Sequence, residues 1–134
     1  MQINSYEWRS HPSGTSSKVN SSLISLANQF KTRYQDRILK MTDDLNIHPS
    51  NASVIIVEVA NELFSEGVTW PKIVALFVLA GEMALICHRL SGAEIVKDLA
   101  ERLSSYIGSN LLMWVINNGG WNGLITYQQE YDDF

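Results

Sequence analysis

The feature that most constrains the fold is the segment from Thr69 to Cys87, which is apolar on nearly every side at helical spacing. Thr69 is a good N-cap residue, and Pro71 falls in the first turn, where a missing amide hydrogen costs little. A helix that is hydrophobic all round has to be buried, so other segments must surround it. Its longest apolar run covers 15 residues from Ile73, whereas a membrane-spanning helix needs about 20. We therefore expect a soluble protein built around one central helix.

Amphipathic helical patterns precede this segment. Between residues 23 and 45 the apolar residues recur every three or four positions, which places them on one face of a helix. They are Leu23, Leu26, Ala27, Phe30, Tyr34, Ile38, Met41 and Leu45. A second helix is expected over residues 53–65, with Gly67 as its terminator. The β-branched run from Val54 to Val57 also fits a strand, but Val59 and Leu63 continue the helical spacing and no partner strand is visible.

The segments after the central helix are also predicted to be helical. Ser91 to Glu94 match a capping box, which opens a helix with an apolar stripe from Val96 to Ile107. Gly108 is expected to end this helix, and two short helical segments follow over residues 111–117 and 121–127. The predicted fold class is all-α, a compact bundle in which amphipathic helices surround one hydrophobic helix.

Length and composition fit one domain of this kind. The 134 residues are 46% hydrophobic, which is enough for a sizeable core. The net charge of −4 gives no general attraction to nucleic acid, so we expect no nucleic-acid partner. The single cysteine makes no internal disulfide, and the N-terminus lacks a signal-peptide pattern. Residues 9–22 are rich in Ser, Gly and Pro and are predicted to form a mobile loop.

No group of residues has the spacing of an enzyme or metal site. Cys87 and His88 are the only neighbouring nucleophile and base, and adjacent helix positions do not face each other. Cys87 is expected in the core instead. The histidines, His11, His48 and His88, lack metal-ligand spacing, so we expect no metal and no cofactor. Glu82 is expected to pair with a basic residue of a neighbouring helix, because a catalytic acid would need a second polar partner. We therefore expect no enzymatic activity.

Two motifs resemble a known family. Residues 61–77, Asn-Glu-Leu-Phe-Ser-Glu-Gly-Val-Thr-Trp-Pro-Lys-Ile-Val-Ala-Leu-Phe, resemble the first homology region of the B-cell-lymphoma-two (Bcl-two) apoptosis regulators, where Asn-Glu-Leu-Phe precedes Gly-Val-Asn-Trp-Gly-Arg-Ile-Val. Residues 114–121, Trp-Val-Ile-Asn-Asn-Gly-Gly-Trp, resemble the second region, Trp-Ile-x-x-Asn-Gly-Gly-Trp. The helix from Leu23 resembles the third region more loosely. The resemblance covers about residues 23–128, and the compactness of the chain is similar to that of viral members.

The resemblance implies a fold with a central hairpin, here Trp70–His88 and Glu94–Ile107. It divides the chain into residues 1–22, an N-terminal remnant helix and flexible loop; residues 23–128, the helical bundle; and residues 129–134, an acidic tail. It also implies a hydrophobic surface groove that binds the amphipathic death-motif (BH-three) helix of pro-apoptotic relatives. By position, the groove residues would be Phe30, Tyr34, Ile38 and Met41 on one wall, and Val59, Leu63, Thr69, Trp70, Lys72, Ala75 and Leu79 on the floor and the other wall.

The chain departs from the family pattern at several of these positions. The family arginine that pairs with the ligand's invariant aspartate is Lys72 here, which keeps the charge but loses the planar fork. Pro71 replaces a glycine and Thr69 an asparagine, which is expected to narrow the range of ligands. In the chain's own third region, Asn28 stands where a death-motif helix carries aspartate.

These residues favour one of two family roles. A pore-forming killer must offer its own third-region helix to a partner's basic groove residue, and Asn28 has no charge to offer. Lys72, by contrast, leaves the receiving side functional. We therefore expect an inhibitor of apoptosis that sequesters pro-apoptotic relatives, with a pore-forming pro-apoptotic protein as the alternative. We expect it in the cytoplasm, where it can associate with mitochondria, without an integral membrane anchor. An empty apolar groove can also bury itself in a homodimer.

Overall fold

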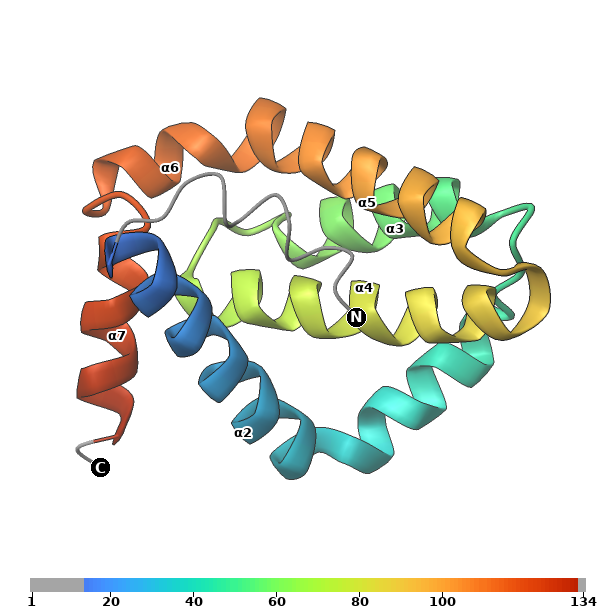
Figure 1. The fold of residues 1–134 in the computed structure, drawn as a ribbon, viewed down its shortest axis with the longest axis horizontal. Helices are drawn as coiled ribbons and strands as arrows, with labels where there is room; N and C mark the ends of the chain where they lie inside the picture. Colours follow the sequence, from blue (N-terminus) through green and yellow to red (C-terminus); the bar gives the residue numbers. More distant parts are fainter. Residues whose placement is uncertain (1–13, 133–134) are drawn as a thin grey trace.

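The computed structural model describes residues 14–132, which are helical over most of their length and contain no strand within those bounds (Figure 1). The elements are α2 (Gly14–Leu45), α3 (Ala52–Leu63), α4 (Trp70–Ser91), α5 (Ala93–Tyr106), the π-helix η1 (Ile107–Leu111), α6 (Leu112–Asn117) and α7 (Asn122–Asp132). Helix α4 contacts α2, α3 and α5, so the predicted all-α bundle around a central helix is confirmed.

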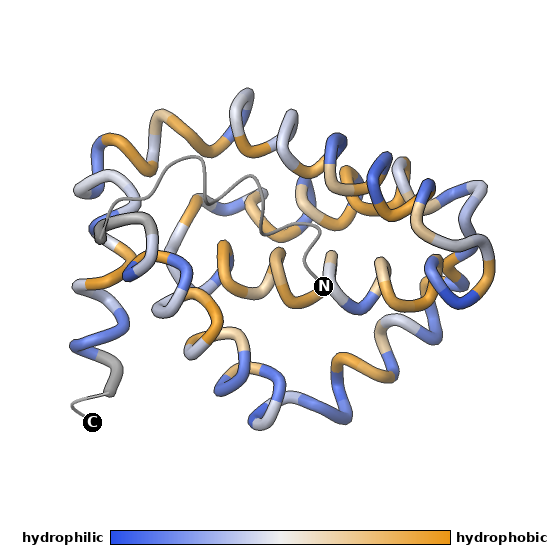
Figure 2. Tube along the Cα trace, in the orientation of Figure 1, coloured by the Kyte–Doolittle hydropathy of each residue, from blue (hydrophilic) through white to orange (hydrophobic). Residues whose placement is uncertain are grey.

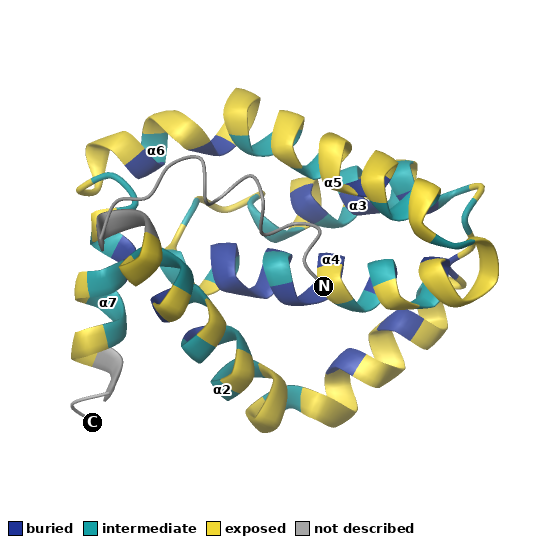
Figure 3. Cartoon of the chain, in the orientation of Figure 1, coloured by how far each residue is buried: buried dark blue, intermediate teal, exposed yellow. Residues whose placement is uncertain are grey.

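Helix α4 supplies more of the core than any other helix, as its apolar sequence predicted. Nine of its residues are buried, among them Ile73 and Leu76 with no exposed surface, and the helix is rich in hydrophobic residues along its length (Figures 2 and 3). The predicted start is also correct, because the Thr69 hydroxyl accepts a hydrogen bond from the Lys72 amide at 3.3 Å. Helix α4 has 22 residues, and its most apolar 18-residue window has a mean hydropathy of 1.9, so the helix is long and apolar enough to cross a membrane. Half of this window is buried inside the bundle.

The hairpin of α4 and α5 turns at Gly92, not at a capping box. Ser91 is the last residue of α4, and Gly92 has a positive φ of 89°, which only glycine adopts without strain. The Gly92 amide donates to the His88 carbonyl at 2.9 Å and closes α4. The side chain of Ser91 caps nothing, so the capping-box prediction is wrong.

The helix after this turn does not end at Gly108. The chain continues from α5 through the wider turn of η1 directly into α6. A π-type turn shifts the phase of the helix, and here Leu111 and Val115 beyond it are both buried, at 1% and 0% exposure. Burial of these two side chains outweighs the modest helix penalty of glycine, about 1 kcal/mol.

Helix α2 begins earlier than predicted and bends in its middle. It starts at Gly14, so residues 14–22, expected as part of a flexible loop, are helical; residues 1–13, with the predicted remnant helix, lie outside the described residues. Packing overrides the weak helix preference of this stretch, because Val19 contacts the core and Ser22 is buried. At Tyr34 the backbone leaves helical geometry, with φ −118° and ψ 24°, and the two halves of α2 diverge (Figure 1).

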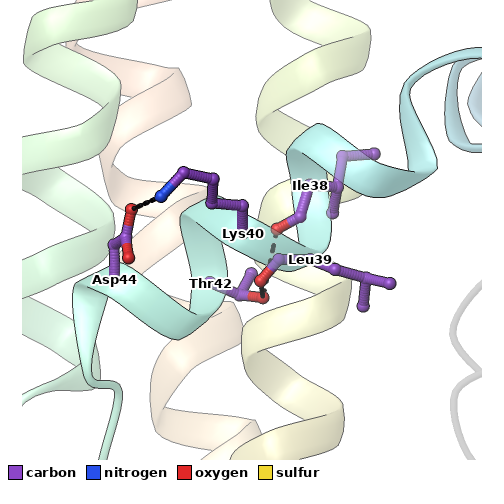
Figure 4. A network of polar contacts seen from close by, with 5 residues as sticks. All are labelled: Ile38, Leu39, Lys40, Thr42 and Asp44. Atoms are coloured by element: carbon purple, nitrogen blue, oxygen red, sulfur yellow. Dashed lines mark hydrogen bonds and ion pairs between the residues drawn. The ribbon is translucent and has the colours of Figure 1, made fainter.

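The C-terminal half of α2 satisfies its own polar groups. The Thr42 side chain is buried, and its hydroxyl lies 3.1 Å from the carbonyls of both Ile38 and Leu39, to which it donates (Figure 4). On the outer side, Lys40 pairs with Asp44 at 3.1 Å, four residues on. These polar groups are therefore satisfied within α2 itself.

An ion pair joins α2 to the central helix. Glu82 of α4 is 21% exposed, and its carboxylate lies 3.3 Å from the Lys31 ammonium of α2. The prediction that this acid pairs with a base of a neighbouring helix is confirmed.

Helix α7 packs against the N-terminal half of α2 and continues to Asp132, so residues 129–132 of the predicted acidic tail belong to it. Its Leu124 has no exposed surface and lies in a core cluster with Leu26 and Val74. The turn before α7 uses Gly119 and Gly120, whose φ angles are 94° and 67°.

Candidate functional site

A surface hollow of about 370 Å³ lies between α2, α3 and α4. Its lining is almost wholly apolar and consists of Phe30, Tyr34, Arg37, Ile38 and Met41 from α2, Leu63 from α3, and Ala75 and Leu79 from α4. Met41 is 43% exposed although it belongs to the apolar face of α2. An apolar residue that faces the bundle and yet remains in contact with solvent indicates a surface that the protein's own side chains do not cover.

A second hollow of about 350 Å³ adjoins the first and shares Met41, Leu63 and Leu79 with it. It adds Leu45 from α2 and a row of α3 residues, Ile55, Glu58, Val59 and Glu62. We call these two hollows together the groove. The C-terminal half of α2 forms one wall, α3 forms the other, and α4 forms the floor.

A smaller hollow of about 240 Å³ extends the groove beyond the bend in α2. It shares Phe30 and Tyr34 with the groove and is closed by Tyr127 of α7. We call it the end hollow. Tyr34 lies at the bend of α2 and lines both the end hollow and the groove.

Eight of the eleven predicted site residues line the groove together. They are Phe30, Tyr34, Ile38, Met41, Val59, Leu63, Ala75 and Leu79. The other three, Thr69, Trp70 and Lys72, are not part of its lining.

Trp70 and Thr69 have structural roles in this fold. The Trp70 ring makes an edge-on contact with Trp114 at 5.0 Å between centroids and a tilted contact with Trp121 at 6.0 Å. Thr69 caps α4 through its hydroxyl. Both side chains therefore hold the start of α4 in place, and the groove depends on them indirectly.

Lys72 lies beside the groove and not within its lining. It precedes Ala75 by three residues and Leu79 by seven, so it shares their face of α4. Its ammonium donates to the Gly67 carbonyl at 3.2 Å, which fastens the side chain to the loop before the helix.

The charged residues of the groove escaped the prediction. Arg37 stands on the α2 wall, and its guanidinium lies 5.8 Å from the centre of the Tyr34 ring. Glu58 and Glu62 stand on the α3 wall. The sequence does carry a signal for them, because each follows an apolar groove residue by three positions: Arg37 follows Tyr34, Glu58 follows Ile55 and Glu62 follows Val59.

The titratable groups with displaced pKa values lie outside the groove. Burial raises the pKa of the Cys87 thiol above its ordinary value of 9.0 and raises that of the Tyr106 hydroxyl above 10.0. Cys87 has no exposed surface while the adjacent His88 is exposed, so the two do not face a common site. Within the described residues, no group of three His, Cys, Asp or Glu side chains could hold a metal ion.

Comparison with known proteins agrees with this site. Residues 23–121 match the family described as "Apoptosis regulator proteins, Bcl-2 family". The chain is 28% identical over 116 residues to Apoptosis regulator R1 of Xenopus laevis, covering 86% of this chain and 51% of that protein. It is 31% identical over 107 residues to Apoptosis regulator Bcl-2 of Gallus gallus, covering 80% and 46%. The chain thus spans about half the length of these curated relatives.

Two solved structures share the fold. One is Trichoplax adhaerens trBcl-2L2 bound to trBak BH3, with a TM-score of 0.81 and 28% identity over 87% of this chain and 77% of that one. The other is chicken BOK, with a TM-score of 0.78 and 26% identity over 93% and 86%. The matched family region contains every residue of the groove. This chain belongs to the Bcl-2 family of apoptosis regulators.

Proposed function

We propose that this protein inhibits apoptosis by binding the amphipathic death-motif (BH3) helix of pro-apoptotic relatives in the groove. The observation that carries the proposal is the continuous apolar groove between α2, α3 and α4. An amphipathic helix binds such a groove through apolar anchors spaced at i, i+3 or i+4, and i+7. The BH3 segment bound to the related Trichoplax structure supports the same use of the fold. The proposed activity is non-enzymatic and takes place in the cytoplasm, including at the mitochondrial surface.

The number of buried apolar anchors and their fit determine how tightly a partner helix binds. Four apolar anchors that become buried contribute about 1.5–3 kcal/mol each, or about 6–12 kcal/mol together. Association itself costs about 4–15 kcal/mol. The fit of each anchor against residues such as Met41, Leu63 and Leu79 therefore decides whether binding is useful.

Three features of α2 favour inhibition of partners over a killing role. A killer would have to offer α2 itself to another groove, but Leu26 and Ile38 on its apolar face are buried, at 4% and 6% exposure. Lys31 also ties α2 to Glu82 of the central helix. Asn28, at the position where a death-motif helix carries aspartate, is exposed and uncharged. By contrast, the receiving side retains a positive charge at Lys72, which we propose can contact a ligand aspartate after leaving the Gly67 carbonyl.

A pore-forming pro-apoptotic role is the second candidate. The observation that favours it is α4, whose length and mean hydropathy of 1.9 would allow it to cross a membrane if the bundle opened. The core helix of a folded bundle can have the same length and hydropathy, and half of the apolar 18-residue window of α4 is buried here. The hydropathy of α4 is therefore weak support for the pore-forming role.

A pair of methionine variants tests the proposal. Met41 lines both hollows of the groove and is 43% exposed, whereas Met113 is 70% exposed on α6, away from the groove. We expect Met41→Glu to weaken binding of synthetic death-motif peptides about tenfold or more in isothermal titration, because a carboxylate is placed among apolar anchors. Met113→Glu should leave the affinity unchanged. Binding of no peptide by the unmodified protein, or equal effects of both variants, would contradict the proposal.

Expression in cells treated with an apoptotic stimulus separates the two roles. An inhibitor protects the cells, and Met41→Glu abolishes the protection while Met113→Glu retains it. Increased death of untreated cells would instead support the pore-forming role.

A further inference from the structure

The two walls of the groove carry opposite charge. Arg37 lines the wall formed by α2, and Glu58 and Glu62 line the wall formed by α3. All three residues are exposed, and the apolar floor of Ala75 and Leu79 lies between the walls. A helix that fills the groove would therefore have one flank beside a cation and the other beside two carboxylates.

The charged groups of the walls form no ion pair with each other or with the rest of residues 14–132. In residues 14–132 the ion pairs are Lys31 with Glu82 and Lys40 with Asp44, and neither includes a wall residue. Glu58 and Glu62 are four residues apart on α3, a spacing at which like charges on one helix face repel each other. A basic side chain from a partner would relieve this repulsion.

The position of Arg37 is held by the groove's own aromatic residue. Its guanidinium lies 5.8 Å from the centre of the Tyr34 ring, within the range of a cation–π contact. The planar guanidinium fork stays free to bind a carboxylate through two hydrogen bonds, which an ammonium cannot do. Arg37 is thus better placed in the groove for a carboxylate than Lys72, whose ammonium is bonded to the Gly67 carbonyl.

We propose that the groove selects a partner helix with an acidic flank along α2 and a basic flank along α3, and that Arg37 binds an acidic side chain on the flank along α2, in addition to the contact proposed for Lys72. This inference rests on the proposed function, since it names the charge pattern of the helix that the groove accepts. It adds a specificity determinant on α2 to the apolar anchors. Exposed charges at the edge of an interface, such as these wall residues, act mainly on the association rate and on the choice between partners. Their effect decreases as the salt concentration rises.

Three synthetic helical peptides with one identical apolar stripe test the proposal. The first has acidic residues on one flank and basic residues on the other, the second is acidic on both flanks, and the third is basic on both flanks. We expect the mixed-flank peptide to bind about fivefold more tightly than either alternative at low salt. The difference should shrink in about 0.5 M NaCl, where the screening length is only a few ångströms.

Charge reversal of the wall should reverse the preference. In Arg37→Glu both walls are acidic, so the peptide that is basic on both flanks becomes the tightest of the three. Arg102→Glu is the matched control, since it makes the same change at an exposed position of α5, which does not line the groove. It should keep the order of the three peptides. Both variants should retain the circular dichroism spectrum of the unmodified protein.

The outcomes separate this inference from the proposed function. Tight binding of all three peptides with equal affinity would overturn the charge pattern and leave the groove function standing. Binding of none of them would overturn both. If Arg102→Glu changes the order of the three affinities as much as Arg37→Glu does, the effect is due to net charge alone. That result would overturn the role of Arg37. A peptide-independent dimer that Arg37→Glu dissociates would show that a second copy occupies the groove, which also overturns the proposal.

Discussion

Replacing Leu124 by alanine should destabilise the whole bundle through the packing of α7. Leu124 has no exposed surface and lies in a core cluster with Leu26, Val74 and Leu79. The substitution removes three buried carbons, and the loss of about 0.8 kcal/mol of hydrophobic free energy per carbon lowers the stability by about 2.4 kcal/mol. The cavity left behind adds to this, and measured Leu→Ala substitutions in cores reach about 2.7–5 kcal/mol. We expect a loss of about 3 kcal/mol in the free energy of unfolding.

Urea unfolding followed by circular dichroism and tryptophan fluorescence measures this loss. With a denaturant slope of about 2 kcal/mol per molar, the midpoint should fall by about 1.5 M. Leu90→Ala is the matched control, because Leu90 is 60% exposed in the last turn of α4 and should lose less than about 0.5 kcal/mol. If Leu124→Ala is no more destabilising than Leu90→Ala, α7 does not pack on the bundle as described.

Two further predictions concern the glycines and the cysteine. A Cβ at Gly123 would collide with the Asn118 carbonyl oxygen and lie 2.9 Å from Trp70 Cζ2, whereas one at Gly81 of α4 meets nothing within 4 Å. Gly123→Ala should therefore lower the thermal midpoint, with a cost of about 1–3 kcal/mol, while Gly81→Ala raises it, with a gain of about 1 kcal/mol. Burial raises the pKa of Cys87 above 9.0, so its thiol should resist modification by a thiol reagent at pH 8 until urea unfolds the protein. The same shift makes stability fall as pH rises above about 9, because the unfolded state loses the thiol proton first; a constant urea midpoint from pH 8 to 10 would contradict it.

The helices were predictable wherever burial and helical spacing agreed. The all-round hydrophobicity of α4 predicted its central position, and the face of α2 that includes Leu26 and Ile38 is the face that the structure buries. The spacing of Val59 and Leu63 correctly outweighed the strand preference of the β-branched run before them.

The errors arose where tertiary packing decided the local structure. Gly108 looked like a terminator, but burial of Leu111 and Val115 favours a continuous helix with one wide turn. The serine-rich stretch before residue 23 looked mobile, but Ser22 is buried and the helix extends back to Gly14. Neither contact is local, so no short sequence pattern could reveal it.

The candidate site also divides into residues that helical spacing predicts and residues that only the tertiary arrangement reveals. Eight of the predicted site residues line the groove, and these are aromatic and aliphatic residues that recur at helical spacing. Arg37, Glu58 and Glu62 were missed because charged residues on a helix surface usually face solvent alone, and only the arrangement of α2 and α3 around α4 shows that these three line the same groove.

The contact between α7 and the first half of α2 also bears on how the protein is synthesised. Ser22 and Gln128 meet across 106 residues of sequence. At about 5–20 residues per second, a ribosome needs about 5–20 s to make that stretch. Throughout this interval the Leu26 side of α2 has no Leu124 to pack against and is open to other nascent chains or to a chaperone. Tyr127 of α7 is part of the lining of the end hollow, so this hollow is complete only after α7 has been synthesised and has packed against α2.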